Sequence, residues 1–257
     1  MSSEVVLLVP TCLVETFLPE VLEAARRVLR HLGVSVKEDA DLTCCGQPMY
    51  NAGLQEEARK VAREFLLRLA RHSGPVVLLA GSCAAMVREE YPRLFAGTPE
   101  EGLAREVAQR TYEFSLFLAD VLKRPVPGRF PHRVAYHPSC HLRRVLGVDA
   151  QPRMLLDALE GLERVPWPDE DVCCGFGGVF SGLLPSLAEA MGRDKILRLR
   201  ATEAQAGVTC DPGCLLHLQG LLGDEGPPML HIAEVLARAL DEARNTPSGI
   251  EHGGREP

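Results

Sequence analysis

The sequence has no long apolar segment. No run of apolar residues approaches the roughly 20 residues that a membrane helix needs. The apolar run at residues 5–9 is too short for the core of a secretory signal peptide. We therefore expect no transmembrane segment and a cytoplasmic location.

An excess of positive charge is also missing. The 257 residues include 28 Lys and Arg against 35 Asp and Glu, which gives a formal net charge of -7 at pH 7. This balance argues against a nucleic acid or an anionic membrane as a partner. Aromatic residues are sparse at 5%, but 46% hydrophobic and 25% charged residues are typical of a soluble globular protein.

The sequence contains no flavin or nicotinamide fingerprint. The glycine-rich segment with Gly175, Gly177 and Gly178 lacks the third glycine spacing of a phosphate-binding loop and directly follows two cysteines. We therefore do not expect this chain alone to be a dehydrogenase.

Cysteine, in contrast, is abundant and regularly placed. Eight of the nine cysteines form one four-cysteine pattern that occurs twice, each time around a Cys-Cys-Gly triplet. The outer cysteines lie 32 residues before and 38 after the pair in the first copy, and 33 before and 40 after in the second. Such self-similarity indicates an internal repeat. The eight are Cys12, Cys44, Cys45 and Cys83 in the first copy, and Cys140, Cys173, Cys174 and Cys214 in the second.

Strand and helix patterns alternate through both copies. In the first half, strands are expected at residues 5–9, 34–36 and 76–79, and helices at 19–32, 54–72 and 113–122, with 88–110 as an insertion. In the second half, strands are expected at residues 133–137, 162–165 and 207–209, and helices at 152–159, 185–206 and from about 214. Helical crossovers give parallel sheets, whose carboxyl ends share one edge. The sequence thus predicts an α/β fold: a tandem repeat of two Rossmann-like parallel-sheet domains with cysteines at the carboxyl ends of the strands.

The division into domains follows from composition. A segment rich in Pro and Gly at residues 125–132 is the expected linker. It separates a first cysteine-rich domain at 1–124 from a second at 133–243. Residues 244–257 are polar, contain Pro and Gly, and are expected to form a disordered tail.

The chemistry follows from the adjacency of two cysteines. In a reducing compartment, cysteines placed in this way are metal ligands or redox thiols. Neighbouring side chains tend to point apart, which suits a polynuclear cluster better than a single zinc ion. Four thiolates per repeat match the ligand number of a [4Fe-4S] or [2Fe-2S] cluster. A zinc site, a catalytic dithiol and buried structural cysteines remain open as alternatives.

A few other residues near the cysteines are candidates for a role. Cys210 has Leu79 as its counterpart in the first repeat, so we expect it in the core. His217 is a possible extra ligand, although a histidine on a helix is more often structural. Four cationic or titratable residues flank Cys140 and either stabilise thiolates or are solvated: His137, His141, Arg143 and Arg144.

At these residues the sequence resembles the CCG cysteine-rich domains of iron-sulfur proteins. It is similar to the CCG-containing component of heterodisulfide reductase and to the glycolate oxidase iron-sulfur subunit, and most similar to the lactate-utilisation protein A group. The fullest form of the motif ends in Cys-x-x-Cys, but this chain has Met86 and His217 at the last position. The ferredoxin-like Cys-x-x-Cys-x-x-Cys segment of the glycolate oxidase subunit is also missing.

The resemblance implies an iron-sulfur electron-transfer subunit of a complex that oxidises lactate, glycolate or another 2-hydroxy acid. The implied cofactor is a [4Fe-4S] cluster bound by the eight cysteines, with zinc as the alternative. The implied partners are a ferredoxin-type iron-sulfur protein, a flavin protein, or both. A thiol-disulfide or persulfide-handling redox protein and a zinc-stabilised subunit remain as alternative functions.

Overall fold

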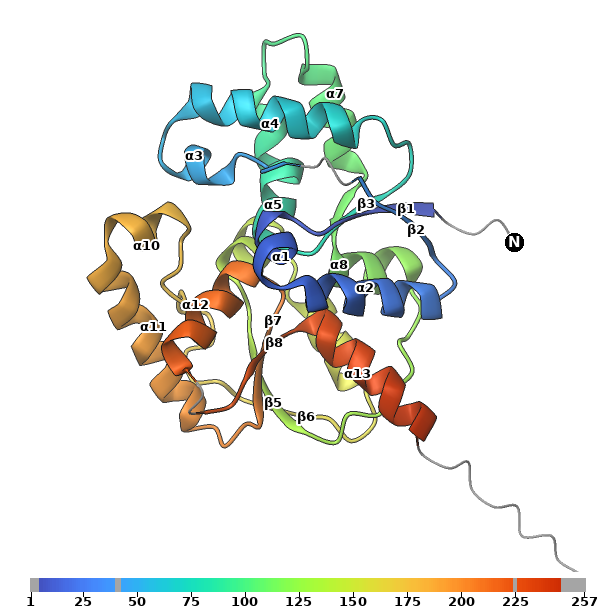
Figure 1. The fold of residues 1–257 in the computed structure, drawn as a ribbon, viewed down its shortest axis with the longest axis vertical. Helices are drawn as coiled ribbons and strands as arrows, with labels where there is room; N and C mark the ends of the chain where they lie inside the picture. Colours follow the sequence, from blue (N-terminus) through green and yellow to red (C-terminus); the bar gives the residue numbers. More distant parts are fainter. Residues whose placement is uncertain (1–4, 40–42, 224–225, 246–257) are drawn as a thin grey trace, which may run out of the picture.

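The computed structural model describes residues 5–39, 43–223 and 226–245. The predicted tail comprises residues 244–257. Its first two residues belong to α13, and residues 246–257 lie outside the described ranges. Two four-stranded, all-parallel sheets dominate the fold, with strand orders β2-β1-β3-β4 and β6-β5-β7-β8 (Figure 1). The predicted α/β fold built as a tandem repeat is confirmed.

The first half is built around the buried strand β1. Its elements are β1 (Val5–Val9), α1 (Cys12–Phe17), α2 (Pro19–His31), β2 (Ser35–Lys37), α3 (Gln47–Asn51), α4 (Gln55–Leu69), β3 (Val76–Leu78), α5 (Gly81–Ala85), η1 (Met86–Glu90), α6 (Tyr91–Leu94), α7 (Glu101–Gln109), β4 (Thr111–Glu113), α8 (Phe114–Leu116) and η2 (Phe117–Leu122). The η elements are π-helical segments.

The second half repeats this order without the α6 and α7 insertion. Its elements are β5 (Arg133–His137), η3 (His141–Val145), α9 (Ala150–Asp157), β6 (Glu163–Val165), α10 (Val179–Leu183), α11 (Pro185–Arg200), β7 (Ala206–Thr209), α12 (Pro212–Leu222), β8 (Met229–His231) and α13 (Ile232–Asn245). No helix in the described ranges is long and apolar enough to span a membrane.

Local sequence explains the best-predicted elements. Four of the five residues of β1 are buried, as its uninterrupted apolar run requires in a parallel strand covered on both faces. Along α2, Val21, Ala25 and Val28 point into the core, and Gly33 follows the helix with a φ of 75°. Left-handed backbone of this kind ends a helix at low cost in glycine.

Two strands, β4 and β8, are present that the sequence pattern does not predict. β4 and β8 are three-residue strands that extend each sheet beyond β3 and β7. Both carry polar residues, including Glu113 and His231, so neither shows the apolar run of the central strands. The helix after β4 begins at Phe114, one residue after the start predicted for the helix at 113–122, and the helix after β8 begins at Ile232.

The two halves are not independently packed. One hydrophobic core contains buried residues from both, from Val6 to Leu240. Helices α2 and α13 lie side by side (Figure 1), and Arg27 on α2 forms an ion pair with Asp241 on α13. The predicted linker joins this core through Val126 and Phe130, which are 2% and 4% exposed. The boundaries 1–124, 125–132 and 133–243 stay a prediction, and the shared core shows that the two halves pack against each other.

Candidate metal centre

All eight cysteines of the repeated pattern line one pocket. Four reach it from just beyond the carboxyl ends of β1, β3, β5 and β7, and the two Cys-Cys pairs reach it from the loops after β2 and β6. The repeated cysteine pattern predicts one site in each half. The structure instead brings both sets of four to one shared pocket. The cysteines that line it are Cys12, Cys44, Cys45 and Cys83 of the first half and Cys140, Cys173, Cys174 and Cys214 of the second.

Within each half the sulfurs are arranged in the same way. The Sγ of Cys45 donates to the Sγ of Cys83 over 3.3 Å, and the Sγ of Cys174 donates to the Sγ of Cys214 over 3.1 Å. In both halves, the second cysteine of the Cys-Cys pair is thus hydrogen-bonded to the cysteine that follows the next strand, β3 or β7. This correspondence shows that the repeat extends to the atoms of the pocket.

The glycine of each triplet is required by its surroundings. The amides of Gly46 and Gly175 donate to the Sγ of Cys44 and Cys173, over 3.4 Å in both cases. Their φ values are 84° and 92°. A Cβ on Gly175 would lie 2.5 Å from the carbonyl oxygen of Ala188. A side chain here would thus meet both backbone strain and a steric clash.

Each repeat contains one strongly acidic thiol. Hydrogen bonds from Cys12 and Cys45 lower the pKa of Cys44 to about 3. In the second repeat, hydrogen bonds from Cys140 and Cys174 lower the pKa of Cys173 to about 2. The donating thiols have raised pKa values in turn. The pocket thus holds a thiolate on each side, the form in which cysteine binds metals.

Several helices begin at the pocket. Cys12 is the first residue of α1 and Cys140 directly precedes η3, while Cys83 and Cys214 lie in the first turns of α5 and α12. The amino-terminal end of a helix carries partial positive charge, which favours thiolates and anionic groups. The same fold that places the cysteines therefore also stabilises negative charge among them.

The remaining predicted candidates fall in different places. His141 lines the pocket, but His217 does not, and its Nε2 lies 3.1 Å from the carbonyl oxygen of Ala188. Arg144 donates to the carbonyl oxygen of Asp171 over 2.9 Å, and Arg143 is 3.8 Å from the carboxylate of Asp149. Cys210 is fully buried in the core, as expected, with its Sγ 3.8 Å from the Tyr136 hydroxyl.

Two buried residues beside the second set of cysteines were not predicted as metal ligands or as buried groups. One ring nitrogen of His137 and the sulfurs of Cys174 and Cys214 all lie within 4.8 Å of one another, a geometry that suits a metal ion. Burial lowers the pKa of His137 to about 3, so its ring is neutral at pH 7. Lys195 is 1% exposed. The only sequence signal for burial of His137 is its position at the end of an otherwise apolar strand.

Comparison with known proteins agrees with this site. The model of the cysteine-rich CCG domain matches residues 6–88 and again residues 134–219. The chain belongs to the CCG cysteine-rich domain family. Each match contains one complete set of four cysteines, so both halves are CCG domains.

This CCG protein is similar to several proteins named Lactate utilization protein A, A 1 or A 2. It is 43% identical over 230 residues to Lactate utilization protein A of Geobacillus kaustophilus, a match that covers 88% of this chain and 95% of the relative. It is 41% identical to the protein of that name from Anoxybacillus flavithermus (88% and 96% covered), and 38% identical to Lactate utilization protein A 2 of Bacillus cereus (90% and 97%). Among solved structures, glutamate racemase isoform RacE1 of Bacillus anthracis aligns at 12% identity over 95% of this chain and 82% of that chain, with a TM-score of 0.38.

Proposed function

We propose that this chain is the iron-sulfur electron-transfer subunit of a complex that oxidises lactate or a related 2-hydroxy acid. The observation that carries the proposal is the convergence of two complete four-cysteine sets on one pocket. Membership of the CCG family and the name of the relatives support the link to lactate.

The donor set fits iron-sulfur clusters. Each repeat offers four thiols, which is the number a [4Fe-4S] or [2Fe-2S] cluster uses. The pocket is built from the Cys-Cys-Gly loops and the ends of the strands, with the pairs Cys45–Cys83 and Cys174–Cys214 already in contact. We assign the first cluster to the cysteines of the first repeat and the second cluster to those of the second, with [4Fe-4S] as the proposed type.

A bound cluster would supply one-electron redox chemistry. The chain's own residues hold it and set its surroundings. The amides of Gly46 and Gly175 donate to cysteine sulfurs, and the helix termini of α1, α5 and α12 favour the negative charge of thiolates. Apolar residues Leu13, Pro48 and Phe176 line the same pocket and lower its polarity.

The proposed partners supply what this sequence lacks. Because the chain has no flavin or nicotinamide fingerprint, a separate subunit must oxidise the 2-hydroxy acid. We propose a flavin protein, a ferredoxin-type iron-sulfur protein, or both, as the partners that exchange electrons with the pocket. Having both cysteine sets in one pocket supports a short route between two clusters.

One observation favours a second candidate, a thiol-disulfide or persulfide-handling protein. Cys44 and Cys173 have strongly lowered pKa values and each lies beside thiols that donate to it. A thiolate next to further thiols is also the arrangement that attacks and releases disulfides.

Metal and sulfide analysis separates the candidates. We expect the full chain, purified without oxygen, to contain iron and acid-labile sulfide in similar amounts. Cys45→Ser and Cys174→Ser should each reduce both. Cys210→Ala is the matched control, since Cys210 lies in the core and does not line the pocket. Zinc without sulfide would identify a zinc-stabilised subunit, and the absence of metal would favour the thiol-disulfide function.

A further inference from the structure

The most unusual group beside the pocket is the imidazole of His137. This residue ends strand β5 and is fully buried. One of its ring nitrogens lies within 4.8 Å of the sulfurs of both Cys174 and Cys214, which are 3.1 Å apart. Ligand atoms on one tetrahedral ion with bonds of about 2.0–2.3 Å lie about 3.3–3.8 Å from one another. Small adjustments would therefore bring the ring nitrogen onto a metal that one of these two sulfurs binds.

Within the described ranges, neither Nδ1 nor Nε2 of His137 makes a hydrogen bond of normal geometry, although the main chain of Glu170 lies close to the ring. A buried polar atom without a partner costs about 1–3 kcal/mol. Native structures keep such groups rarely, and an ion bound by the group is among the usual reasons. The orphaned nitrogens thus point to a ligand role.

The position of the ring is fixed by its neighbours. Trp167 packs at 5.8 Å between ring centroids, and Lys195 lies over the Trp167 ring at 5.0 Å. The Nζ of Lys195 donates to the carbonyl oxygens of Asp169 and Glu170 over 2.9 and 2.7 Å. The loop before Cys173 is thereby tied to α11 next to the histidine.

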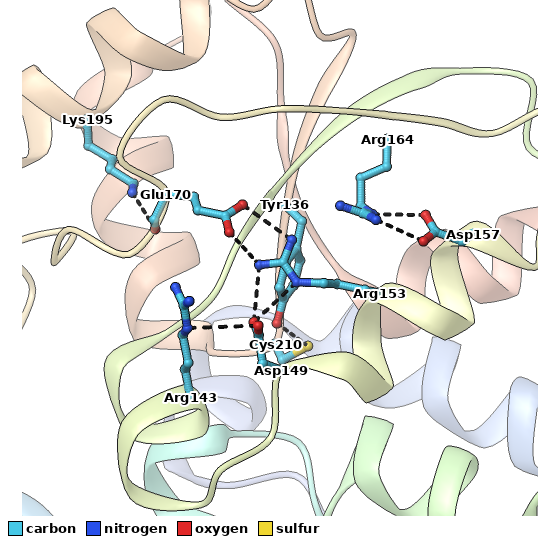
Figure 2. Close-up of polar contacts among 9 residues, drawn as sticks. All are labelled: Tyr136, Arg143, Asp149, Arg153, Asp157, Arg164, Glu170, Lys195 and Cys210. Carbon is cyan, nitrogen blue, oxygen red and sulfur yellow. Dashed lines mark hydrogen bonds and ion pairs between the residues drawn. The ribbon is translucent and has the colours of Figure 1, made fainter.

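Ion pairs of Arg153 also hold the loop before Cys173. Figure 2 shows the carboxylate of Glu170 on the guanidinium of Arg153, which also reaches Asp149. Their closest distances are 2.7 and 3.1 Å. These ion pairs fix the loop beside His137, and the main-chain oxygen of Glu170 on that loop interacts with the ring. Metal-ligating histidines usually have such an oxygen beside their second ring nitrogen.

The first repeat has nothing equivalent. Its matching strand ends in Val9, and Val9 pairs with Leu78 of β3 as His137 pairs with Thr209 of β7. Helices α4 and α11 occupy equivalent positions in the two repeats. The carbonyl oxygen of Ala58 lies beside Gly46, as that of Ala188 lies beside Gly175. This correspondence puts the buried Phe65 where the second repeat has Lys195. The polar residues beside the second site are thus a difference between two otherwise similar sites.

We propose that His137 is a nitrogen ligand of the metal centre in the second repeat, joining Cys174 and Cys214. This inference rests on the proposed function, because it takes the cysteines as metal ligands. The first centre is then bound by thiolates alone, whereas the second has mixed sulfur and nitrogen ligands. The second repeat keeps its four thiolates, so the imidazole is an added ligand. Because imidazole is neutral and thiolate is an anion, the two centres differ in their redox properties.

Pulsed electron paramagnetic resonance tests the ligand directly. The full chain is made with ¹⁵N-labelled histidine, reconstituted with ferrous iron and sulfide without oxygen, and reduced. We expect a strong ¹⁵N coupling on one of the two cluster signals. His137→Val should abolish that coupling, and it imitates the residue that the first repeat carries at this position. The matched controls His141→Ala and His217→Ala should keep it.

The outcomes separate the two proposals. Iron and sulfide at normal levels with no nitrogen coupling, or a coupling that survives in His137→Val, would overturn the role of His137 and leave the proposed function standing. A chain that takes up neither iron nor zinc would overturn both. If His137→Val fails to fold, as judged by its circular dichroism, the labelled wild type and the two control variants decide together. A coupling that both His141→Ala and His217→Ala retain supports the ligand, and one that either variant loses overturns it.

Discussion

The main-chain amide of Ser82 in the first repeat donates a hydrogen bond of 2.8 Å to the carboxylate of Asp211 in the second. The other oxygen of this carboxylate accepts from the amide of Gly213 over 3.0 Å and so caps helix α12. Both residues that form the bond line the pocket. One side chain thus holds the two walls of the pocket together and starts the helix that carries Cys214.

Removing this carboxylate should weaken both connections. We expect Asp211→Ala to lower the free energy of unfolding of the metal-free chain by about 1–3 kcal/mol, because it removes a helix cap and leaves the part-buried amide of Ser82 unpaired. Urea denaturation measures the change. Asp120→Asn, at an exposed position, is the control and should change stability by less than about 0.5 kcal/mol. Equal stability of Asp211→Ala and wild type would refute the role of the bridge.

The triplet glycine of the second repeat should not tolerate a side chain. Gly175→Ala places a Cβ 2.5 Å from the carbonyl oxygen of Ala188 on a backbone with φ of 92°. We expect a loss of stability of about 1–3 kcal/mol and a lower iron content of the reconstituted protein. Gly182→Ala is the matched control, since a Cβ there meets nothing within 4 Å. A fully loaded, fully stable Gly175→Ala protein would contradict this account of the loop.

The second centre should be reduced before the first. The second repeat has Lys195 and the longer glycine loop beside its cysteines, and positive or hydrogen-bonding groups stabilise a reduced cluster. In an anaerobic redox titration, Cys174→Ser should abolish the higher-potential signal and Cys45→Ser should spare it. Loss of the higher-potential signal in Cys45→Ser instead would reverse the order of the two centres.

Air should oxidise specific thiols when no metal is bound. Cys45 with Cys83 and Cys174 with Cys214 are in sulfur-sulfur contact at 3.3 and 3.1 Å. We expect molecular oxygen to accept two electrons and two protons from each pair, which leaves one disulfide in each repeat. Peptide mapping of the unreduced protein by mass spectrometry identifies the partners. Disulfides that mainly link the first repeat to the second would show that the sulfur pairs separate when the metal is lost.

Stability should depend on the ionisation of Glu113. This carboxyl is fully buried, and desolvation raises its pKa to about 7, with Asp211 acting in the same direction. Because the pKa of Glu113 is raised in the folded state, the protonated carboxyl contributes to the free energy of unfolding. This contribution is fully present below about pH 4.5 and is lost as the pH rises through about 7. Glu113→Gln removes this dependence.

The comparison isolates Glu113 from the buried histidines, which titrate in both proteins. We expect the unfolding free energy of Glu113→Gln relative to wild type to rise between about pH 4.5 and 7 by about 1–3 kcal/mol and then to level off. Urea titrations of the metal-free proteins at several pH values measure it. Parallel curves for the two proteins would mean that Glu113 does not titrate in this window.

Sequence alone determined the features that depend on local pattern. The spacing of the cysteines identified the repeat, because each set must reach one place from the ends of different strands. The continuous apolar run at Val5–Val9 and the helical spacing along α2 and α4 predicted elements close to those observed, since burial of one strand or helix face imposes its own period. Cys210 was correctly assigned to the core from its alignment with Leu79.

The tertiary structure alone decided how the two halves meet. The strands β4 and β8 are too short and too polar to be recognised, because their stability comes from pairing with β3 and β7. The packing of α2 on α13 and the bond from Ser82 to Asp211 join residues more than a hundred positions apart. No local pattern encodes such contacts. For that physical reason, the sequence indicated two sets of four cysteines, and only long-range packing brought them into one pocket and placed His137 beside two of them.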